Sequence, residues 1–282
     1  MATRIAFAHE PVTAIVSAME EEIAATRARV VDQRAAQIDG ARVMLGRLAG
    51  APVALVVTGD GERNARRGLA SMLAGTRVAR LIVAGVAGGL SEDLGVGSLL
   101  MADHVVDERS GQVHGADAAL SEIVARACAA RRGVAVSAER IADSAREKRR
   151  LLALAHASVP GRSAVVDLES AAFAAGARRA GIPWLVLRSV SDTADEPVPA
   201  LLNRSRDAGG AVRRGRVVFG LLTDPGAARS LIALRERVRT CGASLARALE
   251  LAAEALWMAD SAPAADAVLT HDPSNPLPRR NS

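Results

Sequence analysis

The chain is poor in aromatic residues and in lysine. It has no tyrosine, two tryptophans and three phenylalanines among 282 residues, and Lys148 is the only one of its 36 basic residues that is not an arginine. Nucleic-acid binders usually cluster basic side chains and interleave aromatic ones that stack on bases. Here the arginines alternate with alanine and glutamate at helical spacing. The net charge of +5 therefore indicates a solvated helix surface, and we expect no nucleic-acid partner.

Cysteine and long apolar runs are also scarce. Cys128 and Cys241 lack metal or redox spacing, and none of the five histidines has a partner four residues away, so we expect no metal and no cofactor. No apolar run reaches the roughly 18–20 residues that span a bilayer. The first residues lack the apolar core and cleavage site of a signal peptide. These absences predict a cytoplasmic protein without stable membrane insertion.

Apolar segments alternate with amphipathic ones along most of the chain, a pattern typical of α/β proteins. We expect a single three-layer αβα domain with a central mixed sheet over residues 12–258, between a flexible lead-in at 1–11 and a disordered tail at 259–282. Strands are predicted at 12–18, 41–48, 52–58, 78–84, 98–106, 134–142, 163–166 and 183–190. Helices are predicted at 20–31, 62–74, 118–132, 145–157, 168–180, 211–223 and 226–258.

The segment 183–192 is the most informative, because a largely apolar strand ends in Ser191 and Asp192. Such strands are buried on both faces of a sheet, and ligands bind outside their carboxyl ends. A second apolar segment at 164–166 runs into Asp167 and Glu169. Carboxylates after strands are often helix N-caps, which suits Asp167. A cap is a poorer explanation for Asp192, because two prolines soon follow it.

Three consecutive acids, Glu20–Glu22, follow the first predicted strand. Carboxylates favour the positive end of a helix dipole, but one or two would be enough for that. Glu22 lies within the first turn, where it could face back over the edge of the sheet. It is therefore a candidate for the same site.

Two glycine-rich segments follow other predicted strands. Gly85–Gly89 predicts a turn whose backbone approaches a ligand closely, with a purely structural tight turn as the alternative. Gly59 and Gly61 resemble part of a dinucleotide fingerprint, but Asn64 replaces the third glycine and the expected later acid is missing. A dinucleotide-dependent oxidoreductase is therefore weakly supported. The segment fits better as a turn whose N–H groups line a pocket.

Four motifs occur together in the order and spacing of the nucleoside phosphorylase/nucleosidase superfamily. They are Ala18–Glu22, Gly85–Leu90 with Val96-Gly97, Val166–Ser170 and Arg188–Asp192. Over residues 12–250 the chain resembles the methylthioadenosine/S-adenosylhomocysteine nucleosidase branch. The chain is also similar to the phosphorylase-like proteins of hopanoid biosynthesis at Glu147-Lys148, Leu221-Leu222 and Pro225. Those proteins are linked to removing adenine from adenosylhopane.

The resemblance implies an enzyme that cleaves the N-glycosidic bond of a 5′-substituted adenine nucleoside and releases adenine. Asp192 would donate a proton to N7 of the base, oriented by Ser191, and Glu22 would activate water on the opposite face of the ribose. Glu169 would hold the 2′ and 3′ hydroxyls and Leu168 would pack against the sugar. The glycine-rich segment, with Val86, Ala87 and Gly88, would line the nucleoside site. The family usually works as a homodimer.

The nucleophile is predicted to be water rather than phosphate. Phosphorylases of this superfamily place a serine in the glycine-rich segment and arginines around the phosphate, whereas this chain has Val86 and Val83 at such positions, and Glu22 would repel an anion. A phosphorolytic purine nucleoside phosphorylase remains the alternative within the family, and a non-catalytic nucleoside-binding protein is the alternative from another class. The 5′ substituent could be methylthio, homocysteinyl or a large apolar group.

The aromatic residue that the family stacks on the base has no obvious counterpart here. Residues 134–162 contain no aromatic residue, and Phe173 and Phe219 are the only phenylalanines beyond the lead-in. A residue borrowed from a neighbouring subunit would fill this gap.

Overall fold

The computed structural model describes residues 10–38, 41–199, 201–204 and 225–261. The strands are β1 (Val12–Ser17), β2 (Val31–Ile38), β3 (Ala41–Leu48), β4 (Ala51–Val57), β5 (Val78–Gly89), β6 (Leu99–Asp107), β7 (Val113–Gly115), β8 (Arg131–Ser137), β9 (Ser163–Asp167) and β10 (Trp184–Asp192). The helices are α1 (Glu20–Arg27), α2 (Glu62–Gly75), α3 (Ala118–Cys128), α4 (Ala145–Ser158), α5 (Ser170–Arg179), α6 (Leu201–Arg204) and α8 (Pro225–Ser261).

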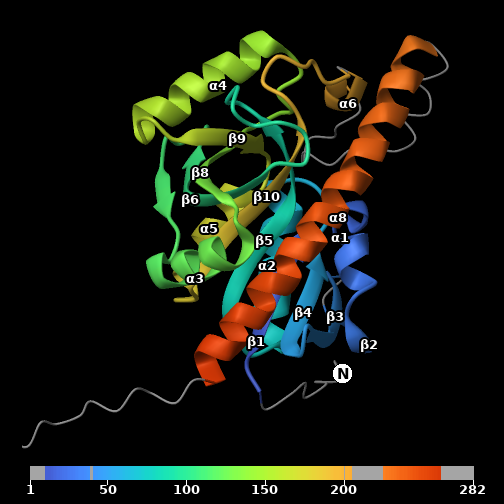
Figure 1. Cartoon of the computed structure of the whole chain (residues 1–282), viewed down its shortest axis with the longest axis vertical. Helices are drawn as coiled ribbons and strands as arrows, with labels where there is room; N and C mark the ends of the chain where they lie inside the picture. The colour runs from blue at the N-terminus through green and yellow to red at the C-terminus, as the bar shows by residue number, and fades with distance from the viewer. Residues whose placement is uncertain (1–9, 39–40, 200, 205–224, 262–282) are drawn as a thin grey trace, which may run out of the picture.

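A mixed sheet forms the centre of the molecule, in the order β10-β6-β8-β9-β5-β1-β4-β3-β2. Because β10 also pairs with β5, the strands β5, β9, β8, β6 and β10 close on themselves, and β1, β4, β3 and β2 extend outward from β5 (Figure 1). The expected α/β class with a central mixed sheet is confirmed. The closure concentrates strand ends around β5 and β10.

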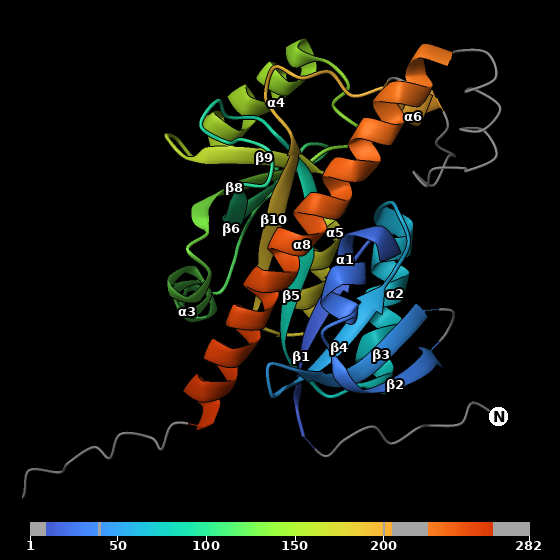
Figure 2. The same cartoon turned by 45° about the vertical axis from the view of Figure 1, so that its right-hand side comes forward.

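Helices cover both faces of this sheet because its central strands are apolar on both sides. In β1, Ala14 and Val16 pack with α2 and α5 in one core, and Ile15 packs in a second core with α1, α3 and α8. The long helix α8 crosses the second face beside α1 (Figures 1 and 2). α4 covers β8 and β9 in a third, smaller core. Every residue of β10 is buried, as its composition predicts.

Several predicted elements differ from the observed ones. The predicted turn at 85–89 is wrong, because those residues continue β5 to Gly89. The first predicted helix ends at Arg27, so residues 31–38 form the additional edge strand β2. The helix predicted at 118–132 ends at Cys128, and the extended segment predicted at 134–142 is instead β8, Arg131–Ser137. The helix predicted at 211–223 lies outside the described residues.

Among the described helices, none combines the length and the apolar character that crossing a membrane would need.

Candidate active site

The carboxyl-terminal part of β5 and the carboxyl-terminal end of β10 form the floor of a polar site. The two strands run parallel and pair Arg188 with Gly85, Ser189 with Val86, Val190 with Ala87 and Asp192 with Gly88. Buried carboxylates approach this floor from α1, from the β9–α5 junction and from β10 itself. The polar groups that the sequence placed at separate strand ends therefore meet along one short stretch of backbone.

Glu22 turns inward from the first turn of α1 and is 4% exposed. Its carboxylate accepts hydrogen bonds from the Ser17 hydroxyl (2.6 Å) and from the backbone N–H groups of Val86 (3.1 Å) and Met19 (3.3 Å). Burial raises the pKa of Glu22, an effect opposed by the nearby Arg188 guanidinium and by these hydrogen bonds. Glu20, by contrast, faces outward and pairs with Arg27. The helix dipole therefore explains Glu20, whereas Glu22 belongs to the site.

Arg188 is a buried cation at the centre of these acids. Its guanidinium donates to Asp167 Oδ2 from Nε (2.9 Å) and to the Ser170 hydroxyl from Nη2 (2.9 Å). A Cβ at Gly85 would lie 2.2 Å from Arg188 Nη1 and 3.1 Å from Glu22 Oε2. Only glycine at position 85 leaves room for the guanidinium and the Glu22 carboxylate together.

Glu169 lies directly before α5 and is 7% exposed. Its Oε1 accepts a hydrogen bond from the backbone N–H of Gly61 (2.8 Å), in the glycine-rich segment before α2. Burial, followed by repulsion from Asp167, raises the pKa of Glu169 to about 7, although the Gly61 N–H and Arg188 oppose the shift. Asp167 accepts the N–H groups of Glu169 and Ser170 and pairs with Arg188, but the N-cap position of α5 is Glu169, so the prediction that Asp167 is the N-cap is wrong.

We expect Glu169→Gln to stabilise the protein at alkaline pH. Because the folded-state pKa lies above the reference value of 4.5, the folded protein binds the extra proton between pH 4.5 and about 7, and stability falls as pH rises through this window. Denaturant unfolding should therefore show the variant more stable than wild type by about 3 kcal/mol at pH 8 and equal to it near pH 4. A difference in unfolding free energy between variant and wild type that does not change with pH would contradict the raised pKa of Glu169.

Asp192 ends β10 and faces a second buried cation. Its Oδ1 accepts the Ser191 hydroxyl (2.6 Å), and its Oδ2 forms an ion pair with Lys148, which is 1% exposed on α4. The Lys148 ammonium also donates to the carbonyl oxygens of Thr193 (2.6 Å) and Glu196 (2.9 Å). Its three protons thus meet three acceptors.

The remaining predicted residues lie around this pair. The Ala87 carbonyl accepts the Ser191 hydroxyl at 3.3 Å, and a Cβ at Gly88 would lie 3.0 Å from Asp192 Oδ2. Val86 contributes its N–H to Glu22. Leu168 is half-buried beside Glu169 and packs on the α4 core.

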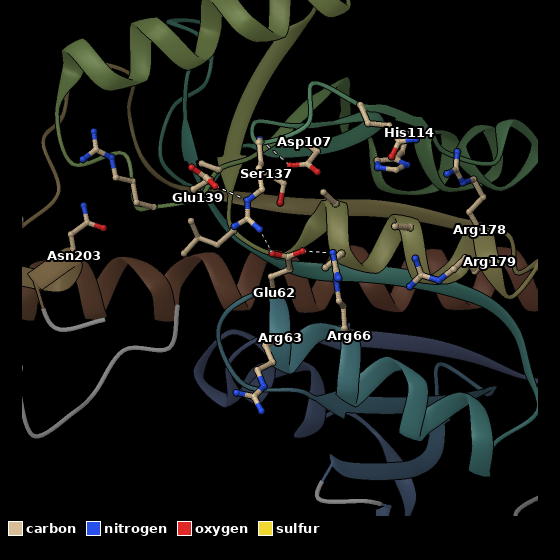
Figure 3. Close-up of a pocket in the computed structure, with 18 of the residues that line it drawn as sticks. Glu62, Arg63, Arg66, Asp107, His114, Ser137, Glu139, Arg178, Arg179 and Asn203 are labelled. Carbon is tan, nitrogen blue, oxygen red and sulfur yellow. Dashed lines mark hydrogen bonds and ion pairs between the residues drawn. The ribbon is translucent and has the colours of Figure 1, made fainter. Parts of the chain in front are cut away.

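A groove of about 990 Å³ opens next to Leu168 (Figure 3). It runs between α2 and α5 and is lined by seven arginines and three carboxylates, together with His114, Gln112, Asn203 and small residues. Figure 3 shows Glu62 and Arg66 reaching up from α2, Arg63 pointing downward from the start of the same helix, and Arg178 and Arg179 at the far end of α5. The acids Glu22 and Asp192 do not line this groove, so it adjoins the floor of the site only at the Leu168 end.

The predicted acids Glu22, Glu169 and Asp192 are therefore all buried around the same strand pair, but two cations were missed. A signal for Lys148 existed, because it is the only lysine in a chain that otherwise uses arginine. From the sequence, Arg188 was identified only as the first residue of the motif Arg188–Asp192.

The predicted aromatic candidates do not line the site. Phe173 packs in the hydrophobic core and Phe219 lies outside the described residues. Within the described ranges, no group of three or more potential ligands is arranged to hold a metal.

The buried acids lie at the carboxyl ends of central strands, where α/β folds bind small-molecule ligands. The family follows from comparison with known sequences: the phosphorylase superfamily matches residues 12–218, and the chain belongs to this superfamily. It is 33% identical over 200 residues to the 5′-methylthioadenosine/S-adenosylhomocysteine nucleosidase of Geobacillus thermodenitrificans, covering 65% of this chain and 84% of that protein. The enzyme of the same name from Geobacillus kaustophilus is 32% identical, with 65% and 85% covered.

Solved structures share the fold at lower identity. A 5′-methylthioadenosine/S-adenosylhomocysteine nucleosidase from Neisseria meningitidis, in complex with methylthio-immucillin-A, superposes with a TM-score of 0.67 at 22% identity over 87% of this chain and 99% of that one. The futalosine hydrolase of Helicobacter pylori gives 0.65 at 19% identity over 86% and 97%.

Proposed function

We propose that this protein hydrolyses the N-glycosidic bond of a 5′-substituted adenine nucleoside and releases adenine. The observation that carries the proposal is the placement of two buried carboxyl groups along β5, with Glu22 bonded to Val86 and Asp192 beside Gly88. Glycosidases commonly act with two carboxyl groups on either side of the sugar, one as the general acid for the leaving group and one as the base for the attacking water. The names of the curated relatives support the same reaction.

The base end of the site is assigned to Asp192 and Lys148. As the bond to C1′ breaks, the purine needs a proton at N7, and the Asp192 carboxyl delivers it. Because Asp192 is paired with an ammonium, we assign the proton to the pair: the Asp192 carboxylate takes a proton from the Lys148 ammonium and passes it to N7, which leaves a neutral lysine, an ionised aspartate and a protonated base. Ser191 fixes the other carboxyl oxygen. General acid catalysis of this kind contributes on the order of 10²–10⁴ in rate.

The sugar end is assigned to Glu22 and Glu169. Water attacks C1′ from the side opposite the base and gives its proton to the Glu22 carboxylate, whose raised pKa makes it a stronger base. The Glu169 carboxylate accepts hydrogen bonds from the two hydroxyls of the cis diol, since a carboxylate has two acceptor oxygens. Leu168 packs against the ribose.

Water is favoured over phosphate because, among the residues that the structure describes, an anion would find no available cation below the sugar. Glu22 occupies that position, and the buried Arg188 is already bonded to Asp167 and Ser170. The glycine-rich segment offers Val86 in place of a hydroxyl. A phosphorolytic enzyme would need to replace this carboxylate by a phosphate ligand.

The test is incubation with 5′-methylthioadenosine and other 5′-substituted adenosines, with and without phosphate, while free adenine is measured. We expect adenine release that is independent of phosphate, together with the free sugar. Turnover that requires phosphate would identify a phosphorylase. Binding of the nucleosides without any release would instead identify a non-catalytic nucleoside-binding protein.

We expect Lys148→Ala to lower kcat by about 10²-fold while KM changes little, because the variant loses the proton source and the donor that holds Asp192. Lys148→Arg should not restore the rate, since a planar guanidinium cannot replace a compact ammonium among three converging acceptors. Methylamine or ethylamine added to Lys148→Ala should restore part of kcat, whereas tetramethylammonium, which has no N–H, should not. Arg149→Ala, an exposed neighbour on α4, is the matched control.

We further propose a cytoplasmic homodimer. Both cysteines are free and buried, as suits a reducing compartment. Phe173 lies in the core, so a partner subunit is an attractive source for an aromatic residue against the base. Sedimentation at several concentrations, with and without substrate analogue, tests the oligomeric state.

A further inference from the structure

The groove beside Leu168 is lined by arginines that have no role in the proposed reaction. The end of the groove that adjoins the site at Leu168, here called the near end, is formed by the first turn of α2, the segment after β8 and the helix α6. Asn203 fastens α6 to the segment after β8: its amide donates to the Ile141 carbonyl (2.8 Å) and to Asp143 (2.9 Å), and its oxygen accepts the Ile141 N–H (3.0 Å). The walls of this end are therefore held together by hydrogen bonds.

The acids at the near end are already neutralised. Glu62 and Glu139 both pair with Arg109, at 3.3 Å and 2.6 Å. Within the part of the chain that the structure describes, Arg63 has no carboxylate partner, and Arg140 reaches Glu147 only at 3.8 Å. Both residues line the groove and both side chains are exposed, so two guanidinium groups without a close carboxylate partner are available on its walls.

The near end is also where the 5′ substituent of a nucleoside would lie. Glu62 follows Gly61, whose N–H binds Glu169, and Leu168 precedes Glu169. With the diol held at Glu169 and the base at Asp192, C5′ lies at the end of the ribose remote from the base, toward residues that line the groove. This placement rests on the proposed function.

We propose that the groove binds an anionic group on the 5′ substituent, with Arg63 and Arg140 as its ligands. Guanidinium groups bind carboxylate and phosphate oxygens in a bidentate manner, and such charge-assisted bonds are roughly twice as strong as neutral ones. A neutral methylthio group leaves these cations unused. A large apolar group such as hopane would lie against charged side chains.

The probes that test this inference are two nearly isosteric adenosines, one with a 5′-(2-carboxyethylthio) group and one with the corresponding carboxamide. We expect kcat/KM for the acid to exceed that for the amide by about tenfold or more at low ionic strength. The ratio should shrink as salt rises from about 0.02 M to about 0.5 M, because exposed charges are screened. In Arg63→Gln/Arg140→Gln the ratio should approach one.

Two matched variants keep the assignment specific. Arg67→Gln, exposed on α2 but outside the groove, should leave the ratio unchanged. Arg179→Gln changes an arginine at the far end of α5, about 15 Å along the helix, and should also leave it unchanged. A ratio near one in wild type, a ratio that survives the double variant, or preference for a 5′-decylthio probe would overturn the inference.

The result is separable from the proposed function. Adenine release from 5′-methylthioadenosine with equal kcat/KM for acid and amide overturns the anion site alone. If no probe is cleaved, the hydrolase proposal fails. Calorimetric titration of the wild-type protein with the acid and the amide then decides whether the groove selects the anion, and equal affinities would overturn that selection.

Discussion

Replacing Asp192 by asparagine is expected to lower kcat for 5′-methylthioadenosine by about 10³-fold, within the range on the order of 10²–10⁴ that a general acid contributes. Asparagine keeps the size and one acceptor oxygen of aspartate, but it cannot give a proton to N7 and recover it from Lys148. Binding should largely remain, so the loss appears in kcat rather than in KM. Single-turnover adenine release and calorimetric binding of a substrate analogue measure the two quantities separately.

The same substitution leaves the Lys148 ammonium buried without its counter-charge. Breaking a buried ion pair from one side typically costs about 3–5 kcal/mol, so Asp192→Asn should also unfold at lower temperature. The double variant Asp192→Asn/Lys148→Met removes both charges and should recover much of that stability without recovering activity. An active double variant, or an Asp192→Asn enzyme with wild-type kcat, would show that another group protonates the base.

The acids of the site could be predicted from the sequence because each follows a recognisable strand. An apolar run that ends in a carboxylate carries its own signal, as at Glu169 and Asp192, and the position relative to the sheet follows from the α/β rule. Glu22 was harder to assign, because an acid at a helix start has an electrostatic explanation of its own. Burial distinguishes it from Glu20, and burial depends on what packs above α1.

The cationic half of the site could not be predicted in the same way. Lys148 lies on a helix 44 residues before Asp192, within a run of charged residues whose arginines face solvent. Gly85 was interpreted as part of a turn because local sequence cannot distinguish a glycine that bends the chain from one that leaves space. The reason for glycine there is the guanidinium of Arg188, more than a hundred residues later in the chain.

The missed strand β2 has a similar cause. Residues 31–38 include alanine, glutamine and arginine, which favour helices, and their strand lies at the edge of the sheet against β3 alone. Pairing with the well-formed β3–β4 hairpin outweighs local propensity, as is common for strands.

Arg188→Met is expected to have the largest effect on stability. Asp167 would lose the 2.9 Å bond from Nε and the 2.8 Å contact with Nη2, and Glu22 and Glu169 would lose the positive charge that opposes their raised pKa values. Three carboxylates would then share one buried region with no guanidinium among them. Leaving such charges uncompensated costs about 3–5 kcal/mol.

The pH dependence identifies the cause of that loss. Removing the cation raises the pKa of carboxyl groups that it favours in the ionised form, so the folded variant binds more protons and its stability falls more steeply with rising pH than that of wild type. Urea unfolding at pH 5 and pH 8 should therefore show the larger deficit at pH 8. Arg29→Met, which breaks a surface pair with Glu250, should cost no more than about 1 kcal/mol at either pH. If Arg188→Met were equally destabilised at both pH values, lost packing rather than lost charge would explain it, and the carboxylates would not form the coupled cluster on which the catalytic assignment depends.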